Sequence, residues 1–320
     1  MTAWWFEMTN NLPSSFVLSQ EVARALERGQ PVVALESTVI THGLPYPENL
    51  TLAEDMEETV RSYGATPATI AMLEGRVHVG LQPAELQSLA SGSPGLVKVS
   101  LRDFAPAIGR MASGGTTVAG TMYAASRVGI RVFATGGIGG VHYDLGTHPR
   151  GAADISADLP ALARIPMVVV CAGAKAILDL QATLEYLETW SVPVVGYKTD
   201  YFPAFYTESS GLKASTRADS PEEVAFIAHT HWELGMPGAV LVGVPPPAEV
   251  AMDAEEVKQA VRTALVEARE DKIIGQAVTP YLLEKMSEIT GGDSLRANLG
   301  LLLNNATVAS QIAQVINLRR

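Results

Sequence analysis

A lysine that follows an apolar run is the most reactive feature of this sequence. Lys175 lies in Cys171–Leu178, just after Met167–Ala172, a run that is typical of a buried strand. Ligands of open α/β sheets bind at the carboxyl ends of the strands. Apolar neighbours favour an uncharged amine, which is a nucleophile. The alternative is a lysine that closes the strand and extends to water, and the sequence weighs the two equally.

Carboxylates occur at two other places in the sequence. Glu36 closes the apolar run Pro31–Leu35, where it could act as a general acid or base; by itself, a cap or an ion pair is the favoured interpretation. Asp154, Ser156 and Asp158 offer hard oxygen ligands for Mg²⁺ or Mn²⁺. The alternative for Asp158 is a helix N-cap.

Glycines gather in two places. Thr135–His142 follows a strand-like run, and Ser113–Thr117 leads into a helix-like one. Glycine lets backbone N–H groups approach an anion closely, and a helix start adds a favourable dipole. Neither cluster matches a dinucleotide or P-loop fingerprint, so tight turns are favoured over phosphate binding. A structural role is likewise favoured for His42 and for His142, which ends the first cluster.

Alternating strand-like and helix-like segments must position these residues. The pattern predicts a layered α/β/α domain around a largely buried mixed sheet, with a helical C-terminal region. We expect an N-terminal extension over residues 1–15 and a single domain over 16–320. The predicted strands are Pro31–Leu35, Ala68–Leu73, Arg76–Leu81, Ile130–Ala134, Met167–Ala172, Val192–Tyr197 and Ala239–Val244. The predicted helices are Glu21–Arg28, Asn49–Tyr63, Thr116–Arg127, Ala176–Thr189, Pro221–Leu234, Asp253–Asp271, Pro280–Ile289 and Ser294–Ile316.

Composition excludes several classes of protein. A hydrophobic fraction of 47% argues against bulk disorder, and no stretch approaches the roughly 18 apolar residues of a membrane span. A net charge of −11 disfavours non-specific nucleic-acid binding, so we expect no nucleic-acid and no membrane partner. The single cysteine, Cys171, cannot form an intrachain disulfide, and the N-terminus does not resemble a signal peptide. We therefore expect a cytoplasmic protein.

Several blocks together resemble the pseudouridine-5′-phosphate glycosidase family. They occur in the expected order and span about residues 30 to 315, which makes a chance resemblance untenable. The matching blocks are Ala34–Pro45, Thr135–His142, Asp154–Leu159, Val170–Leu180 and Thr290–Leu295 with Asn304-Asn305.

The resemblance implies a metal-dependent α/β enzyme, usually a homotrimer, that acts on a small-molecule nucleotide with Mn²⁺ or another divalent ion such as Mg²⁺. It makes Lys175 the nucleophile, Glu36 the acid/base and Asp154 the metal ligand. The substrate residues that it implies are Lys98, Val118, Thr135, His142, Ser156, Ala157, Asp158 and Asn298, with Thr135 and Asn298 expected near the phosphate. The stretch from His142 to Asp154 is longer than the family pattern, so the family's site position there is either His142 or the stretch His148–Arg150. The block Ser100–Asp103 has one arginine where the family often has two.

The resemblance implies cleavage of the carbon–carbon glycosidic bond of pseudouridine 5′-phosphate to uracil and ribose 5-phosphate, and the residues fit this reaction. A carbon leaving group is not released by protonating an oxygen or nitrogen at the anomeric centre, so a pair of carboxylates is insufficient. A lysine that forms an imine offers another route. Two alternatives remain open: a lysine-dependent lyase or aldolase on another sugar phosphate, and a non-catalytic sugar-phosphate sensor.

Overall fold

A computed structural model describes residues 12–316 of the chain except 93, 144–153 and 274. Most of the predicted extension 1–15 and of the long segment after His142 therefore lies outside the described residues. The single domain over 16–320 stays a prediction.

The predicted mixed sheet is confirmed, and it has eleven strands within the described part of the chain. Its main path runs β1-β4-β3-β2-β7-β9-β13-β11-β12, with β6 on β3 and β5 on β6. The segment from β3 to β12 is parallel along this path, whereas β4 and β6 are antiparallel to β3. The strands are β1 (Phe16–Leu18), β2 (Val32–Leu35), β3 (Thr66–Leu73), β4 (Arg76–Val79), β5 (Val97–Val99), β6 (Gly114–Thr116), β7 (Val132–Ala134), β9 (Val168–Cys171), β11 (Val194–Tyr197), β12 (Thr216–Ala218) and β13 (Val240–Gly243). A separate pair joins β8 (Val141–His142) to β10 (Leu178–Asp179).

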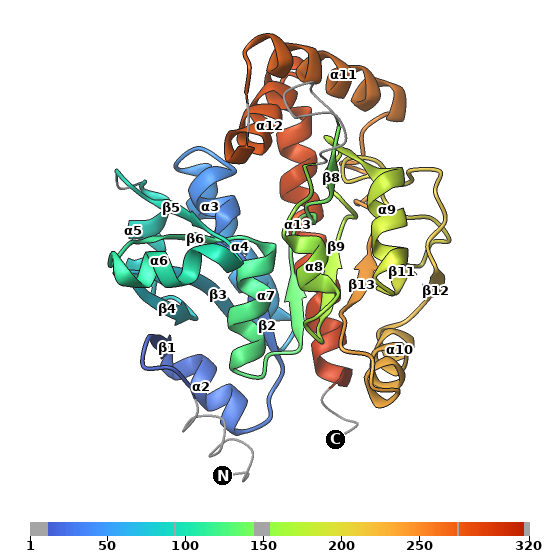
Figure 1. The fold of residues 1–320 in the computed structure, drawn as a ribbon. Helices are drawn as coiled ribbons and strands as arrows, with labels where there is room; N and C mark the ends of the chain where they lie inside the picture. Colours follow the sequence, from blue (N-terminus) through green and yellow to red (C-terminus); the bar gives the residue numbers. More distant parts are fainter. Residues whose placement is uncertain (1–11, 93, 144–153, 274, 317–320) are drawn as a thin grey trace.

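Helices cover both faces of the sheet (Figure 1). On one face, α13 crosses β2, β7 and β9 and packs against α4 and α10. On the other, α7 packs on β2 and β3 and contacts α8. The α-helices are α2 (Gln20–Glu27), α3 (Thr38–His42), α4 (Glu48–Ser62), α5 (Pro83–Ala90), α6 (Phe104–Gly109), α7 (Val118–Arg127), α8 (Asp158–Leu162), α9 (Leu180–Thr189), α10 (Pro221–Glu233), α11 (Ala254–Glu270), α12 (Val278–Ile289) and α13 (Asp293–Ile316), with short 3₁₀ turns η1 (Leu101–Asp103) and η2 (Gly275–Ala277).

The central strands are apolar throughout because both of their faces are covered. Every residue of β2, β7, β9, β11 and β13 is buried. Continuous runs of valine and alanine, rather than an alternating pattern, are typical of such strands. This explains why the sequence located them within a residue or two.

Two segments differ from the prediction. The helix expected from Ala176 begins at Leu180, because Leu178 and Asp179 pair with β8 and the Asp179 side chain accepts a hydrogen bond from the N–H of Ala182 at 2.9 Å. The glycine cluster Ser113–Thr117 contributes strand β6 instead of a loop. A side chain at Gly115 would lie 2.7 Å from the carbonyl oxygen of Ser37, so close packing accounts for this glycine.

Helix α13 is a core helix. Its 24 residues are long and apolar enough to cross a membrane by length and composition, which differs from the expectation that no stretch approaches this limit. Leu301, Ala309 and Ile312 are nevertheless fully buried, and the helix packs on the central strands. Its apolar character is thus explained by burial inside the protein.

Candidate active site

The candidate site is a cavity of about 430 Å³. Part of its wall comes from the segments that follow β2 and β9, as expected for an open α/β sheet. A smaller adjoining cavity of about 50 Å³ is lined by Val39, His42, Gly43, Gly136, Gly137, Phe205, Pro280, Leu283, Asn298 and Leu302, besides the residues that it shares with the larger one. The residues shared by both cavities are Glu36, Thr38, Lys98, Lys175 and Thr279.

Strand register brings Glu36 to Thr135. Leu35 at the end of β2 is paired with Ala134 at the end of β7, so the next residue of each strand lies at the same level. The Thr135 hydroxyl donates a short hydrogen bond to the Glu36 carboxyl group, although the two are 99 positions apart in the chain. Burial raises the pKa of Glu36, while Lys175, the Thr135 bond and Lys98 lower it less. A carboxyl group with a raised pKa is suited to donating a proton.

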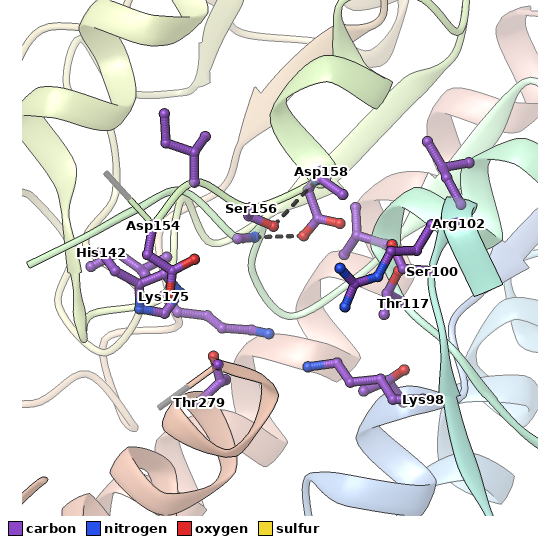
Figure 2. A pocket seen from close by; sticks show the side chains of 18 of the residues that line it. Lys98, Ser100, Arg102, Thr117, His142, Asp154, Ser156, Asp158, Lys175 and Thr279 are labelled. Atoms are coloured by element: carbon purple, nitrogen blue, oxygen red, sulfur yellow. Dashed lines mark hydrogen bonds between the residues drawn. The ribbon is translucent and has the colours of Figure 1, made fainter. Parts of the chain in front are cut away.

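Two lysines reach into the cavity from different elements (Figure 2). Lys175 follows β9, and its backbone N–H donates to the carbonyl of Ile138 at 3.1 Å. Lys98 lies in β5, and its amine faces that of Lys175. Burial lowers the pKa of Lys98, and the charge of Lys175 lowers it further, against the opposing effects of Asp158 and Glu36. The site therefore gathers two amines beside carboxyl groups, which suits a nucleophile and an anion-binding group.

Asp158 joins two walls of the cavity. Its carboxylate accepts from the N–H of Ala119 in the first turn of α7 at 2.9 Å, and from the N–H of Gly139 at 2.8 Å. Its own N–H donates to the hydroxyl of Ser156 at 3.2 Å. Asp158 is the first residue of α8 and not its cap, so the N-capping alternative is wrong. The described contacts make it a positioning residue at the cavity wall.

Several N–H groups of the loop Thr135–His142 donate hydrogen bonds within the protein. Ile138 donates to the carbonyl of Gly173, Gly139 to Asp158, Val141 to the hydroxyl of Thr183, and His142 to the carbonyl of Asp154. These donors are not available to a phosphate. The interpretation as a tight connection, which the sequence favoured, describes this part of the loop.

Asp154 lies at the other side of the cavity from Lys98. Figure 2 places its carboxylate beside His142 and Lys175, apart from Asp158. The carbonyl of Asp154 accepts from the N–H of His142 at 2.9 Å, which fixes these two segments against each other. In the described part of the chain, no group of three or more His, Cys, Asp or Glu side chains is arranged to hold a metal ion.

The remaining predicted substrate residues divide into two groups. Val118, His142, Ser156 and Ala157 line the larger cavity, and Asn298 lines the smaller one. Thr135 is fully buried and lines neither cavity. The Thr135 hydroxyl is engaged by Glu36, and its contact with the phosphate stays a prediction.

His42 lines the smaller cavity, and the structural role favoured for it stays a prediction. The Thr41 hydroxyl donates to the carbonyl of Ser37 at 3.2 Å and lies 2.6 Å from Nδ1 of His42. The contact with the Thr41 hydroxyl holds the imidazole ring in place at the cavity wall. Burial lowers the pKa of His42, and the charge of Lys98 lowers it further, which favours the neutral ring.

Sequence reasoning missed several residues that line the cavity. They are Thr38, Ser100, Arg102, Thr117 and Thr279. Four had a sequence signal: Thr38 lies two positions after Glu36, Thr117 ends a glycine cluster, and Ser100 and Arg102 belong to a block that resembles the family. Thr279 had none, because it belongs to the C-terminal helices and reaches the site only through the tertiary fold.

The fold and the site define a class of α/β protein with a lysine and a carboxyl group in one cavity, and comparison with known proteins places the chain in a family. The family model described as indigoidine synthase A like protein matches residues 21–315, and the chain belongs to this family. Two solved structures share the fold, each with a TM-score of 0.86. A prealnumycin C-glycosynthase in complex with ribulose 5-phosphate is 39% identical and covers 96% of this chain and 98% of its own. An indigoidine synthase A-like protein from Thermotoga maritima is 33% identical and covers 96% and 99%.

Relatives of known name make the assignment more specific. A pseudouridine-5′-phosphate glycosidase of Symbiobacterium thermophilum is 52% identical over 92% of this chain and 95% of its own. The enzyme of the same name from Arabidopsis thaliana is 47% identical over 97% and 93%. The resemblance found in the sequence blocks is confirmed: the chain belongs with the pseudouridine-5′-phosphate glycosidases.

Proposed function

We infer that this protein cleaves the carbon–carbon glycosidic bond of pseudouridine 5′-phosphate, reversibly, to give uracil and ribose 5-phosphate. The similarity to glycosidases of that name, at about half the residues over nearly the whole chain, carries this inference. The presence of Lys175 and Glu36 in one cavity supports it, because this bond requires more than two carboxylates.

The first step is ring opening. Glu36, whose pKa burial raises, donates its proton to the ribose ring oxygen as the C1′–O4′ bond breaks. The amine of Lys175 adds to C1′ and then loses a proton. The result is an open-chain sugar that is bonded through C1′ to both the lysine nitrogen and C5 of uracil.

The second step releases the base. C5 of the uracil ring gains a proton, and the electrons of the C1′–C5 bond return to the ring as the bond breaks. The nitrogen lone pair of Lys175 forms a C=N bond to C1′, which is an imine. Water hydrolyses this imine to ribose 5-phosphate and the free amine. The protonated uracil ring takes up the electrons of the broken bond. The nitrogen lone pair stabilises C1′ as that bond breaks, which the sugar oxygen no longer does once the ring is open.

Lys98 is the proposed partner of the phosphate. Its amine lies in the cavity on the side where Ser100, Arg102 and Thr117 also line the wall. A charge-assisted contact with a phosphate is among the stronger polar interactions. The positive charge of Lys98 also acts on the nearby carboxyl group of Glu36, whose pKa it lowers.

A divalent metal ion fits the site only if most of its ligands come from outside the chain. Asp154 is the proposed protein ligand, and Mn²⁺ or Mg²⁺ would complete its shell with water and substrate oxygens, as Mg²⁺ often does. When bound, such an ion orients oxygen ligands and offsets negative charge. Chelation followed by readdition of Mn²⁺ or Mg²⁺ measures this requirement through activity, and Mn²⁺ binding followed by electron spin resonance should weaken in Asp154→Asn.

The assembly and location are proposals too. A homotrimer is proposed from the family resemblance, and light scattering on a size-exclusion column measures the mass directly. Action in the cytoplasm is proposed from the single cysteine, Cys171, which is buried and free.

Uracil release tests the function. The purified protein is incubated with pseudouridine 5′-phosphate and Mn²⁺, and uracil is followed by chromatography beside Lys175→Ala. Uracil from the wild type alone supports both the substrate and the nucleophile. Uracil from both proteins removes Lys175 from the mechanism. No uracil from a folded, metal-loaded wild type refutes the function and favours a lyase on another sugar phosphate or a sensor.

A further inference from the structure

Thr38 carries a hydroxyl group that no residue in the described part of the chain pairs with. Its Oγ1 is buried, and it has no hydrogen-bond partner among the described residues. Buried polar atoms are nearly always paired, because an unpaired one loses its contacts with water without replacement. The unused hydroxyl therefore indicates a partner that is not part of the chain.

The neighbouring hydroxyls show that local pairing was possible. Ser37 donates to the carbonyl of Ile70 at 2.5 Å and accepts from the N–H of Thr116 at 2.9 Å. Thr41, one turn later, donates to the carbonyl of Ser37 at 3.2 Å. Both hydroxyls that flank Thr38 in this segment thus stabilise the fold, whereas that of Thr38 does not.

The position of Thr38 identifies the part of a ligand that it meets. Thr38 lines both cavities, as do Glu36, Lys98 and Lys175, so these residues surround the junction between them. Under the proposed function the amine of Lys175 must reach C1′ and the carboxyl group of Glu36 must reach the ring oxygen. The reacting end of the sugar therefore lies at this junction, within reach of Thr38.

We propose that Thr38 is a further substrate-binding residue, whose hydroxyl forms a hydrogen bond with a sugar oxygen beside C1′. The two sugar oxygens nearest to C1′ are the ring oxygen, which is bonded to it, and the 2′-hydroxyl on the neighbouring carbon, and a threonine hydroxyl can pair with either. This proposal rests on the proposed function, since it needs a sugar at the junction. The competing partner is the uracil carbonyl next to C5, which is also close to C1′.

Trapping ribose 5-phosphate alone separates sugar from base. Wild type, Thr38→Val and Thr38→Ser are incubated with increasing ribose 5-phosphate, reduced with borohydride and analysed by intact mass. Loss of one neutral hydrogen bond should raise the half-saturating concentration about three- to tenfold in Thr38→Val. Thr38→Ser keeps the hydroxyl and should stay close to the wild type.

A stability measurement tests the unpaired state itself. Thr38→Val should not lower the free energy of unfolding of the ligand-free protein, because no hydrogen bond is lost. Thr69→Val is the matched control: the Thr69 hydroxyl is buried and donates to Glu57 at 2.6 Å, so its loss should destabilise the protein. A loss of stability in Thr38→Val equal to that in Thr69→Val would show a partner within the chain and overturn the proposal.

The outcomes are distinct. Unchanged trapping of ribose 5-phosphate by Thr38→Val overturns the proposal, and a defect seen only with pseudouridine 5′-phosphate assigns the hydroxyl to the base instead. Uracil release by the wild type, measured in parallel, reports on the proposed function separately. A wild type that neither traps the sugar nor releases uracil overturns both.

Discussion

The hydrogen bond from Thr135 to Glu36 gives a sharp prediction, because it joins a fully buried hydroxyl to the proposed acid. Thr135→Val keeps the shape of the side chain and removes the donor. Glu36 then loses a contact that fixes its carboxyl group at the cavity wall. The substitution should therefore reduce activity without touching the substrate directly.

The magnitude follows from the type of bond. A hydrogen bond to a charged group contributes about 1.5–3 kcal/mol, and 1.4 kcal/mol corresponds to a tenfold change in rate. If the contact is needed in the transition state, kcat/KM should fall roughly 10- to 100-fold. Because the Thr135 bond lowers the pKa of Glu36, its removal should also raise that pKa further.

The sign of the pH effect is determined by the role of Glu36. A proton donor is active below its pKa, and activity falls as the pH rises through it. In Thr135→Val this alkaline limb of the kcat/KM profile should move to higher pH, whereas Thr135→Ser should retain the wild-type profile. A valine variant with unchanged kcat/KM and an unchanged alkaline limb would refute the assignment of Thr135 as the residue that positions Glu36.

Two further substitutions test the cavity wall. Gly139→Ala would place a methyl group against the Ser156 hydroxyl and 2.8 Å from the Asp158 carboxylate, so overpacking should cost about 1–3 kcal/mol in urea unfolding and lower kcat/KM. Gly109→Ala is the control, since a methyl group there meets nothing within 4 Å; equal effects in both would contradict the packing argument. Asp158→Asn retains one acceptor oxygen and sets an amide group against the second N–H. The free energy of unfolding should therefore fall by about 1.5–3 kcal/mol. Unfolding at the wild-type denaturant midpoint would show that Asp158 does not join α7 to the glycine loop.

Local pattern located the buried strands and the long helices because each signal lies within one segment. The apolar runs before Glu36 and Lys175 required burial on both faces of a sheet, and they form β2 and β9. The short strands β5 and β6 were missed, since three residues with two glycines in β6 have no periodicity to detect. The start of α9 was misplaced because pairing with β8 holds Leu178 and Asp179 out of the helix.

The sequence by itself determined which side chains could do chemistry: an amine and a carboxyl group, each at the end of an apolar strand. The tertiary structure decided which of them meet. Strand order places β7 between β2 and β9, and register sets Glu36 beside Thr135, a contact between residues 99 positions apart. It likewise decided that Thr135 is buried beside the acid and that Thr38 lines the cavity without a hydrogen-bond partner among the described residues. Composition and periodicity report how much of a residue is buried, whereas its partners depend on which distant segments the fold brings beside it.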